Sequence, residues 1–176
     1  MNRPGLLVAL SRYPATRRYG SAILIRDNLE SLSQRFDLHL VCRGDHPVEN
    51  DLAAFCRTTE FLGREYPLIP KPLRRPLRLF SGLPPVDYGL RSPRVRARLD
   101  SLMATGGFEA LLVYDQASVQ YVPAAWAART VVCIEDAQSI RQEALAALPV
   151  WTTWQRLRLR AEARQMRRYE RRVLPP

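Results

Sequence analysis

The sequence predicts an α/β fold, a Rossmann-like, doubly wound parallel sheet. Two observations predict it. Apolar stretches of strand length alternate along the chain with stretches whose apolar residues recur at helical spacing. Several of the strand-like stretches are apolar without interruption, which is typical of strands buried on both faces of a parallel sheet. With 176 residues, the chain is long enough for one domain with its own core.

The first half of the chain supplies the first strands and a helix. The helix is indicated by Ala22, Ile25 and Leu29, which lie at helical spacing with charged residues on the other faces. In order, we expect a strand at 5–10, a helix at 21–36, a strand at 36–43, a short helix at 49–56 and a short strand at 58–63.

A proline-rich, basic stretch at 66–93 precedes the second half, and we expect a short helix between loops there. The next helix, at 92–107, is signalled at both ends: Ser92 fits the N-cap, and Gly106 with Gly107 fits the stop. Runs at 109–115 and 129–136 are expected to be strands buried on both faces. Residues 1–150 would then form the Rossmann-like domain, with a basic helix at 151–176 packed on it or extending from it.

Composition excludes several classes of protein. The chain has no run of about 18 apolar residues, so no spanning helix is expected, and its first apolar run is too short for a signal peptide. Its three cysteines, Cys42, Cys56 and Cys133, have neither metal-binding nor redox spacing. We therefore expect a cytoplasmic protein without a metal site or a cofactor of its own.

The charge points to an anionic partner. The formal net charge is +10, and residues 71–176 hold most of the excess. A basic surface of this kind suits an anionic membrane or nucleic acid. The aromatic residues do not interleave with the basic clusters and no nucleic-acid-binding motif is present, so no specific nucleic acid is expected.

Ligands of such sheets bind beyond the carboxyl ends of the strands, and three of these ends carry candidate residues. The first is followed by SRYPATRRYGSAILIRDNL, in which Gly20 opens the predicted helix. A helix N-terminus with a glycine suits a phosphate group, although the glycine equally fits an ordinary turn. The second end carries Tyr114, Asp115 and Gln116.

The third end carries two adjacent acids, Glu135 and Asp136. Such acids could act as a general base, form hydrogen bonds with sugar hydroxyls or bind a cation. They equally suit the acidic N-terminus of a helix, with Asp136 as its cap.

The last helix is amphipathic. Its apolar side is formed by Trp151, Trp154, Leu157, Ala161, Tyr169 and Val173. Its basic side is formed by Arg156, Arg160, Arg164, Arg167 and Arg171. Two interpretations stay open. The helix lies on an anionic membrane surface together with the basic stretch at 71–98, or its apolar stripe packs on the sheet and its arginines are solvated.

Taken in order, these segments resemble the N-terminal, acceptor-side domain of family 4-like glycosyltransferases of GT-B architecture. The resemblance rests on LSRYPATRRYGSAILIRDNLESLSQRFDLHLVCRGD, LSGLPPVDYGLRSPRVRARLDSL, FEALLVYDQASVQYVP, VVCIEDAQS and EARQMRRYERRVL, which together span nearly the whole chain. It implies a Rossmann-like half that binds a glycan or lipid-linked acceptor, while a second half binds the nucleotide-sugar donor.

The resemblance also implies roles for individual residues. The donor-phosphate loop would contain Tyr19, Gly20, Ser21 and Arg26. The acceptor would contact Tyr114, Asp115, Gln116 and Gln138. Glu135 and Asp136 would be catalytic, and the five arginines of the last helix would face the inner side of the cell membrane.

Three departures from the family pattern bear on activity. The first loop has Tyr19-Gly20 where the family often has paired glycines, and Glu135-Asp136 stands where the family often has His-Asp. The glycine-rich donor loop and the spaced pair of glutamates of the donor half are absent from this sequence. We therefore expect a truncated or split enzyme that is inactive alone. The alternatives are a non-catalytic module that binds a membrane surface or an acceptor, and a nucleotide-binding oxidoreductase, whose glycine fingerprint is missing.

Overall fold

A computed structural model gives the fold and describes residues 3–14, 20–45, 47, 51–63, 90–134 and 137–173. By its contacts the chain divides into two compact units, each of which is described by itself. The first unit comprises Met1–Glu65 and Arg91–Cys133, and the second comprises Tyr66–Leu90 and Ile134–Pro176. The domain boundary expected at residue 150 thus falls inside the second unit.

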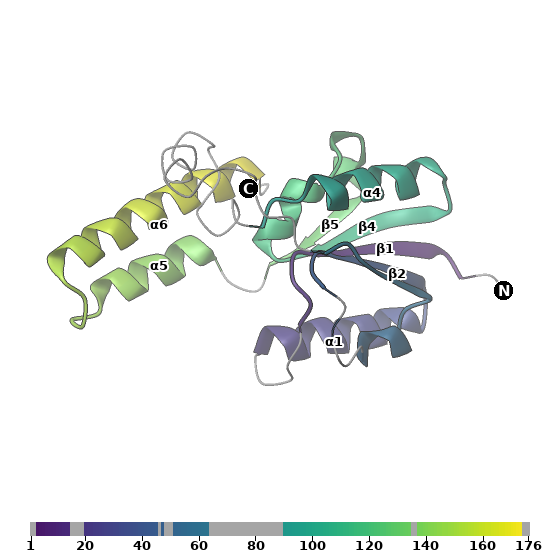
Figure 1. Ribbon diagram of the computed structural model, residues 1–176, viewed down its shortest axis with the longest axis horizontal. Helices are drawn as coiled ribbons and strands as arrows, with labels where there is room; N and C mark the ends of the chain where they lie inside the picture. Colours follow the sequence, from purple (N-terminus) through teal and green to yellow (C-terminus); the bar gives the residue numbers. More distant parts are fainter. Residues whose placement is uncertain are drawn as a thin grey trace. The chain divides into compact units, whose positions relative to one another are not determined.

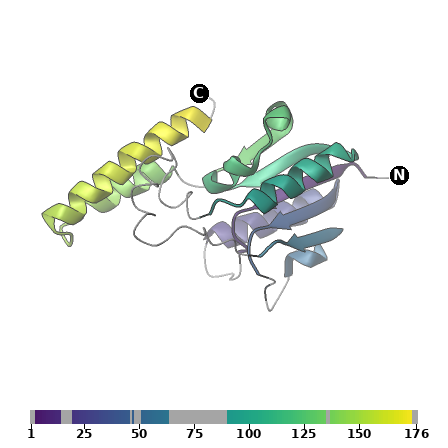
Figure 2. The same cartoon turned by 45° about the horizontal axis from the view of Figure 1, so that its top comes forward.

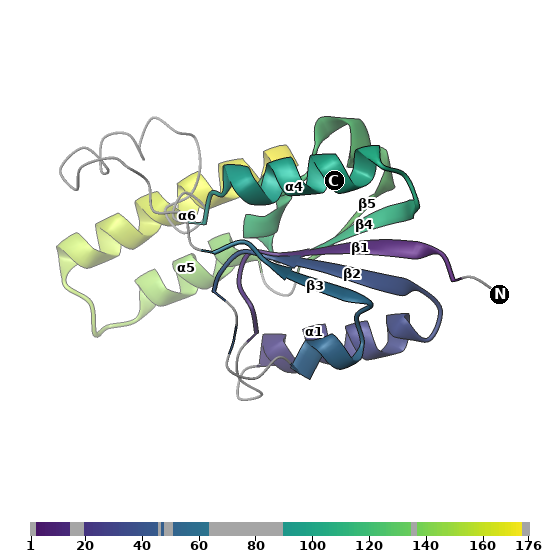
Figure 3. The same cartoon turned by 45° about the vertical axis from the view of Figure 1, so that its right-hand side comes forward.

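The first unit is built on a five-stranded sheet in which every pairing is parallel. Its strands are β1 (Gly5–Leu10), β2 (Asp37–Cys42), β3 (Thr58–Phe61), β4 (Phe108–Tyr114) and β5 (Thr130–Cys133). They lie in the order β3-β2-β1-β4-β5, as Figure 3 shows, with β1 at the centre. Register pairs Leu10 of β1 with Cys42 of β2 on one side and with Tyr114 of β4 on the other.

Helices cover both faces of this sheet, as the two-residue period of the central strand requires. Leu6, Val8 and Leu10 point to one side, into a cluster that contains Ile25 and Leu29 of α1 (Gly20–Ser33). Leu7 and Ala9 point to the other side, into a cluster with Val95, Leu99 and Met103 of α4 (Pro93–Ala104). Figure 1 shows α1 and α4 on opposite faces, so the sheet is doubly wound as predicted.

The chain begins β1 with a glycine for a steric reason. A Cβ placed on Gly5 would lie 2.3 Å from the carbonyl oxygen of Gly107, which is too close for any side chain. Gly107 itself has a φ of 93°, a conformation that favours glycine, and it leads directly into β4. Two glycines therefore allow β1 and β4 to start side by side.

Ser92 caps α4 as predicted, with its hydroxyl accepting a hydrogen bond from the backbone N–H of Val95. The segment predicted as a short helix at 49–56 contains one 3₁₀ turn, η1 (Asp51–Ala54). Two further 3₁₀ helices that the sequence pattern did not predict follow β4, namely η2 (Gln116–Tyr121) and η3 (Ala124–Arg129).

The prediction that the strand at 129–136 is buried on both faces was wrong. β5 is an edge strand of four residues, none of them fully buried, and Val131 is 58% exposed. Its apolar sequence does not distinguish it from a central strand, since only the pairing partners decide how much of a strand is covered.

In the second unit, α5 (Gln138–Ala147) and α6 (Thr153–Val173) form an antiparallel hairpin, which Figure 2 shows as two helices side by side. Ala146 of α5 and Ala163, Met166 and Tyr169 of α6 are buried. Of the two interpretations of this helix, the packed apolar stripe does not hold for Trp154 and Leu157, which are 76% and 52% exposed. No helix in the described part of the chain is long and apolar enough to cross a membrane.

Candidate binding site at the carboxyl edge of the sheet

The order of the strands defines one place where ligands of parallel sheets bind. From β1 the chain moves outward to β2 and β3, and it then crosses to β4 and β5 on the other side of β1. The edge beyond the carboxyl ends of β1 and β4 is therefore the topological switch point. Ser11 directly follows β1, and Asp115 directly follows β4.

Ser11 and Asp115 join across this point. The hydroxyl of Ser11, which is fully buried, donates a hydrogen bond of 2.5 Å to Oδ2 of Asp115. The other carboxylate oxygen, Oδ1, accepts a bond of 2.8 Å from the backbone N–H of Ser118. The backbone N–H of Asp115 donates to the carbonyl of Cys133 at the end of β5. One aspartate thus connects the ends of β1, β4 and β5 with the start of η2.

The backbone and the charge of Asp115 are both unusual. Its φ of 66° is the one positive value among the described residues other than glycine, and such strain persists only where the surroundings hold it. Burial raises the pKa of this carboxyl above its ordinary value, while the hydrogen bonds from Ser11 and Ser118 act in the opposite direction. The carboxylate is therefore held in place but is poorly solvated.

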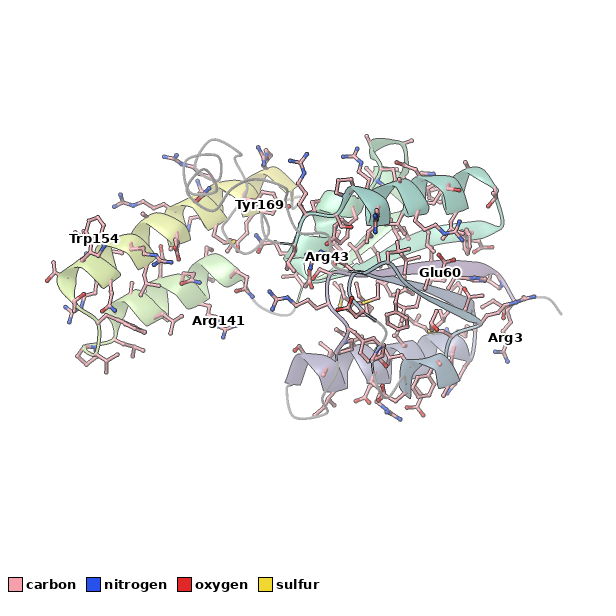
Figure 4. The ribbon with its side chains drawn as sticks, viewed as in Figure 1. Arg3, Arg43, Glu60, Arg141, Trp154 and Tyr169 are labelled. Atoms are coloured by element: carbon pink, nitrogen blue, oxygen red, sulfur yellow. The ribbon has the colours of Figure 1, made fainter. Side chains whose placement is uncertain are left out.

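The residues around Asp115 are mostly buried. Tyr114 is 1% exposed and belongs to the core beside α1, and Gln116 is 3% exposed. Burial also raises the pKa of the Cys42 thiol to about 12, with the charge of Asp115 as the next cause. Arg43, which follows β2, bonds through its backbone N–H to the carbonyl of Leu10, and Figure 4 shows it near the carboxyl ends of the strands.

The predicted donor-phosphate residues differ in their exposure and in their partners. Gly20 and Ser21 begin α1 and are exposed, and no described atom lies within 4 Å of where a Cβ on Gly20 would be. Tyr19 lies outside the described residues. Arg26 is half-buried and forms an ion pair of 2.7 Å with Asp51, with its guanidinium over the ring of Phe55.

Asp51 also forms a hydrogen bond with Tyr13, in the loop after β1. Its Oδ1 accepts a bond of 2.8 Å from the hydroxyl of Tyr13, which in turn accepts one from the backbone N–H of Leu52. Burial is the largest cause that raises the pKa of Tyr13 to about 12. Arg26, Tyr13 and Asp51 thus fasten α1 and the loop after β1 to η1, so in this state the charge of Arg26 is already balanced.

The predicted catalytic pair, Glu135 and Asp136, lies outside the described residues, as does most of the basic stretch at 71–98. Gln138, predicted to contact the acceptor, is the first residue of α5 in the second unit and is half-buried there. The N-cap position of α5 belongs to Ala137, and Asp136, which the sequence offered as a cap, lies outside the described residues.

The five arginines predicted to face a membrane lie on α6 in different environments. Arg167 pairs with Glu143 of α5 at 2.5 Å, and Arg156 donates to the carbonyl of Pro149. Arg160 and Arg164 line a hollow of about 230 Å³ with Glu143 and Ala147. Arg171 is exposed.

Sequence reasoning missed Ser11 and Asp51. Ser11 stands immediately after a buried strand, which is a signal for a switch-point residue only once the strand order is known. Asp51 carried no signal, since its partners Tyr13 and Arg26 are 38 and 25 residues away.

The arrangement at the switch point suits hydrogen bonding better than nucleophilic chemistry. A carboxylate accepts hydroxyl groups, as Asp115 already does from Ser11, and it also accepts from backbone N–H groups of η2. The Cys42 thiol, with its raised pKa, is a poor nucleophile. Within the described ranges, no three His, Cys, Asp or Glu side chains are grouped as metal ligands.

The fold defines an α/β class with a Rossmann-like parallel sheet, and its neighbour among solved structures is a GT-B glycosyltransferase. That neighbour is the sucrose-phosphate synthase of Thermosynechococcus elongatus. The TM-score is 0.51 and the identity is 17% over 97% of this chain and 45% of the synthase, so the chain spans less than half of the neighbour's length. No family model matches the chain, and no curated protein matches its sequence.

Proposed function

We propose that this chain is the acceptor-binding part of a glycosyltransferase of the family 4-like type, which moves a sugar from a nucleotide-sugar donor to a glycan or lipid-linked acceptor. One observation supports the proposal above the others. The buried Ser11–Asp115 pair lies at the switch point of a sheet whose fold is shared with a sugar-transferring enzyme. In this proposal Asp115 accepts a hydrogen bond from an acceptor hydroxyl, and Gln116 lies beside it.

The chemistry of Asp115 supports this role. A carboxylate in a poorly solvated site forms stronger hydrogen bonds than one in water, because few water molecules compete for it. Ser11 fixes one oxygen, and the N–H of Ser118 fixes the other, so the carboxylate does not need to reorganise when a hydroxyl arrives. Such preorganisation raises affinity by lowering the cost of ordering.

The donor side of the proposal rests on Gly20 and Ser21. The first backbone N–H groups of an α-helix have no partner within the helix, and such groups suit a diphosphate. The open space beside Gly20 allows a ligand to approach the backbone. Glu135 and Asp136 keep their proposed roles as catalytic residues, which depend on the family resemblance.

Saccharide binding by the intact chain tests the acceptor role directly. We would screen oligosaccharides and short-chain lipid-linked saccharides by NMR and measure the affinity of the best ligand by calorimetry. Asp115→Asn keeps the shape of the side chain and removes its charge, so we expect the affinity to fall by about tenfold, as for a charge-assisted hydrogen bond. Asp100→Asn, at an exposed position on α4, is the matched control and is expected to bind as the parent does.

Two results would contradict the proposal. One is that no saccharide of the panel binds to the folded chain. The other is that Asp115→Asn and Asp100→Asn bind a saccharide ligand with the same affinity, which would place the binding site elsewhere.

A further inference from the structure

The turn between α5 and α6 exposes a group of apolar side chains. Leu148, Val150, Trp154 and Leu157 are 44%, 76%, 76% and 52% exposed, respectively. Figure 4 shows Trp154 near the start of α6, at the turn of the hairpin. A tryptophan indole covers a large apolar area, so its exposure beside three aliphatic side chains is not the ordinary scatter of single apolar residues on a surface.

This exposure is set by a well-defined turn. Thr152 and Gln155 form a reciprocal capping box: the backbone N–H of Thr152 donates to the side-chain oxygen of Gln155, and the N–H of Gln155 donates to the hydroxyl of Thr152. The guanidinium of Arg156 also donates to the carbonyl of Pro149, at 3.2 Å. These bonds fix the start of α6, and with it the direction of Trp154.

Positively charged side chains follow the apolar group along the first turns of α6. No acidic residue occurs between Glu143 and Glu162, whereas Arg156, Arg158 and Arg160 all fall in that interval. Arg160 and Arg164 are three and seven positions after Leu157, so Leu157 lies next to them, at the border between the apolar and basic sides of α6. Within the described part of the chain, Arg158 and Arg167 of α6 form ion pairs, whereas Arg160 and Arg164 form none and share their hollow with Glu143.

We propose that the turn at 148–157 docks this protein on an anionic lipid bilayer. Val150, Trp154 and Leu157 enter the interfacial layer, while Arg160 and Arg164 contact the lipid phosphates. Three features favour lipid over a protein partner: a tryptophan stands at the boundary between apolar and charged residues, the charged residues between Glu143 and Glu162 are all arginines, and the turn at 148–157 itself contains no acid. The proposal does not depend on saccharide binding by the first unit.

Cosedimentation of the intact chain with vesicles measures this docking. We expect binding to vesicles of phosphatidylcholine mixed with phosphatidylglycerol, little binding to phosphatidylcholine alone, and weaker binding as salt is raised. Trp154→Ser is expected to lower the partition coefficient about tenfold or more, given the area the indole buries. Arg160→Gln and Arg164→Gln are expected to lower it about fivefold each, because a cation near an anionic surface contributes about 1 kcal/mol.

Matched controls separate docking from general loss of apolar or charged surface. Ile140→Ser removes another exposed side chain of the hairpin, 63% exposed on α5 and outside the turn, and Arg96→Gln removes an exposed cation on α4. Both variants are expected to bind vesicles as the parent does. Circular dichroism of each variant confirms that the helices persist.

A second readout reports the position of the indole itself. Vesicles with brominated acyl chains are expected to quench the fluorescence of the parent and of Trp151→Phe, and to quench Trp154→Phe much less. The proposal is overturned if the chain ignores anionic vesicles at low salt, or if Trp154→Ser and Ile140→Ser bind equally. It is also overturned if the turn instead drives self-association without lipid, seen by sedimentation as an oligomer that Trp154→Ser abolishes.

Discussion

Glu170, near the end of α6, accepts two hydrogen bonds from Ser139 at the start of α5. The backbone N–H of Ser139 donates to Oε1 at 3.0 Å, and its hydroxyl donates to Oε2 at 2.5 Å. The N-cap position of α5 is Ala137, which has no side chain able to cap the helix. A carboxylate from the neighbouring helix therefore takes the place of a local cap and also meets the positive end of the helix dipole.

Removal of Glu170 is expected to loosen the start of α5. Glu170→Ala leaves the first backbone N–H groups without this acceptor, and loss of a cap costs about 1 kcal/mol. Hydrogen exchange followed by mass spectrometry is expected to speed up in the first turn of α5. Glu162→Ala, on the same helix in an i, i+4 pair with Arg158, is the control, and equal effects of the two variants would contradict the capping role.

Gly5 and Gly20 are expected to respond oppositely to alanine. Gly5→Ala brings a Cβ to 2.3 Å from a backbone carbonyl, so β1 and β4 must separate and the free energy of unfolding should fall by about 1–3 kcal/mol. Gly20→Ala meets no described atom and has ordinary backbone angles, so stability should be unchanged or rise by about 0.5–1 kcal/mol. Urea denaturation of both variants measures the difference, and a large loss in Gly20→Ala would show that the glycine is needed by the fold itself.

Ser11→Ala is expected to destabilise the protein more at neutral pH than in mild acid. Burial raises the pKa of Asp115 in the folded state, so stability falls as pH rises from the usual aspartate pKa through the raised one. The Ser11 hydroxyl opposes that shift, and without it the ionised carboxylate loses a donor, which costs about 1–3 kcal/mol.

In acid, where Asp115 is protonated, the loss should be smaller. Urea denaturation at both pH values tests this, with the exposed Ser101→Ala as control. A loss that is the same at both pH values would mean that the hydroxyl does not act on the charge of Asp115.

Glu60→Gln is expected to remove a pH-dependent contribution to stability at the edge of the sheet. Arg98 donates two hydrogen bonds to Glu60, at 2.6 and 2.7 Å, and these bonds hold the pKa of Glu60 below its usual value. A lowered pKa stabilises the fold above the usual glutamate pKa, and that gain is lost as pH falls through the lowered value.

Because both side chains are partly exposed, we expect a difference of only about 0.5–1 kcal/mol between parent and Glu60→Gln at neutral pH, and none in strong acid. Thermal denaturation over a pH series measures it. Glu109→Gln, at an exposed position in β4, is the matched control.

Much of the fold was predictable because the buried central strands are continuous apolar runs in the sequence. The run GLLVAL predicted β1 with its observed bounds, and Ser92 with Pro93 predicted the start of α4. The burial of β5 was predicted wrongly, because an edge strand can be as apolar as a central one. The 3₁₀ helices η2 and η3 were not predicted, because 3₁₀ turns leave no periodic pattern.

The candidate site was predictable only in part. Asp115 was found because it ends an apolar run, whereas Ser11 is significant only through the pairing of β1 with β4. Trp154 and Leu157 have the spacing of a packed stripe, but the buried residues of α6 are Ala163, Met166 and Tyr169 instead. Helical spacing shows which residues share a face, and only tertiary structure decides which face is covered.

The position of β1 has a consequence for synthesis of the protein. β1 leaves the ribosome well before β4, yet one of its two edges pairs with β4, which ends at Tyr114. Until then the most buried strand of the sheet has an open, apolar edge, able to pair with another nascent chain. Its partner on the other side, β2, arrives early and covers one edge only. Correct folding therefore depends on β1 staying protected while the chain from Leu10 to Tyr114 is made.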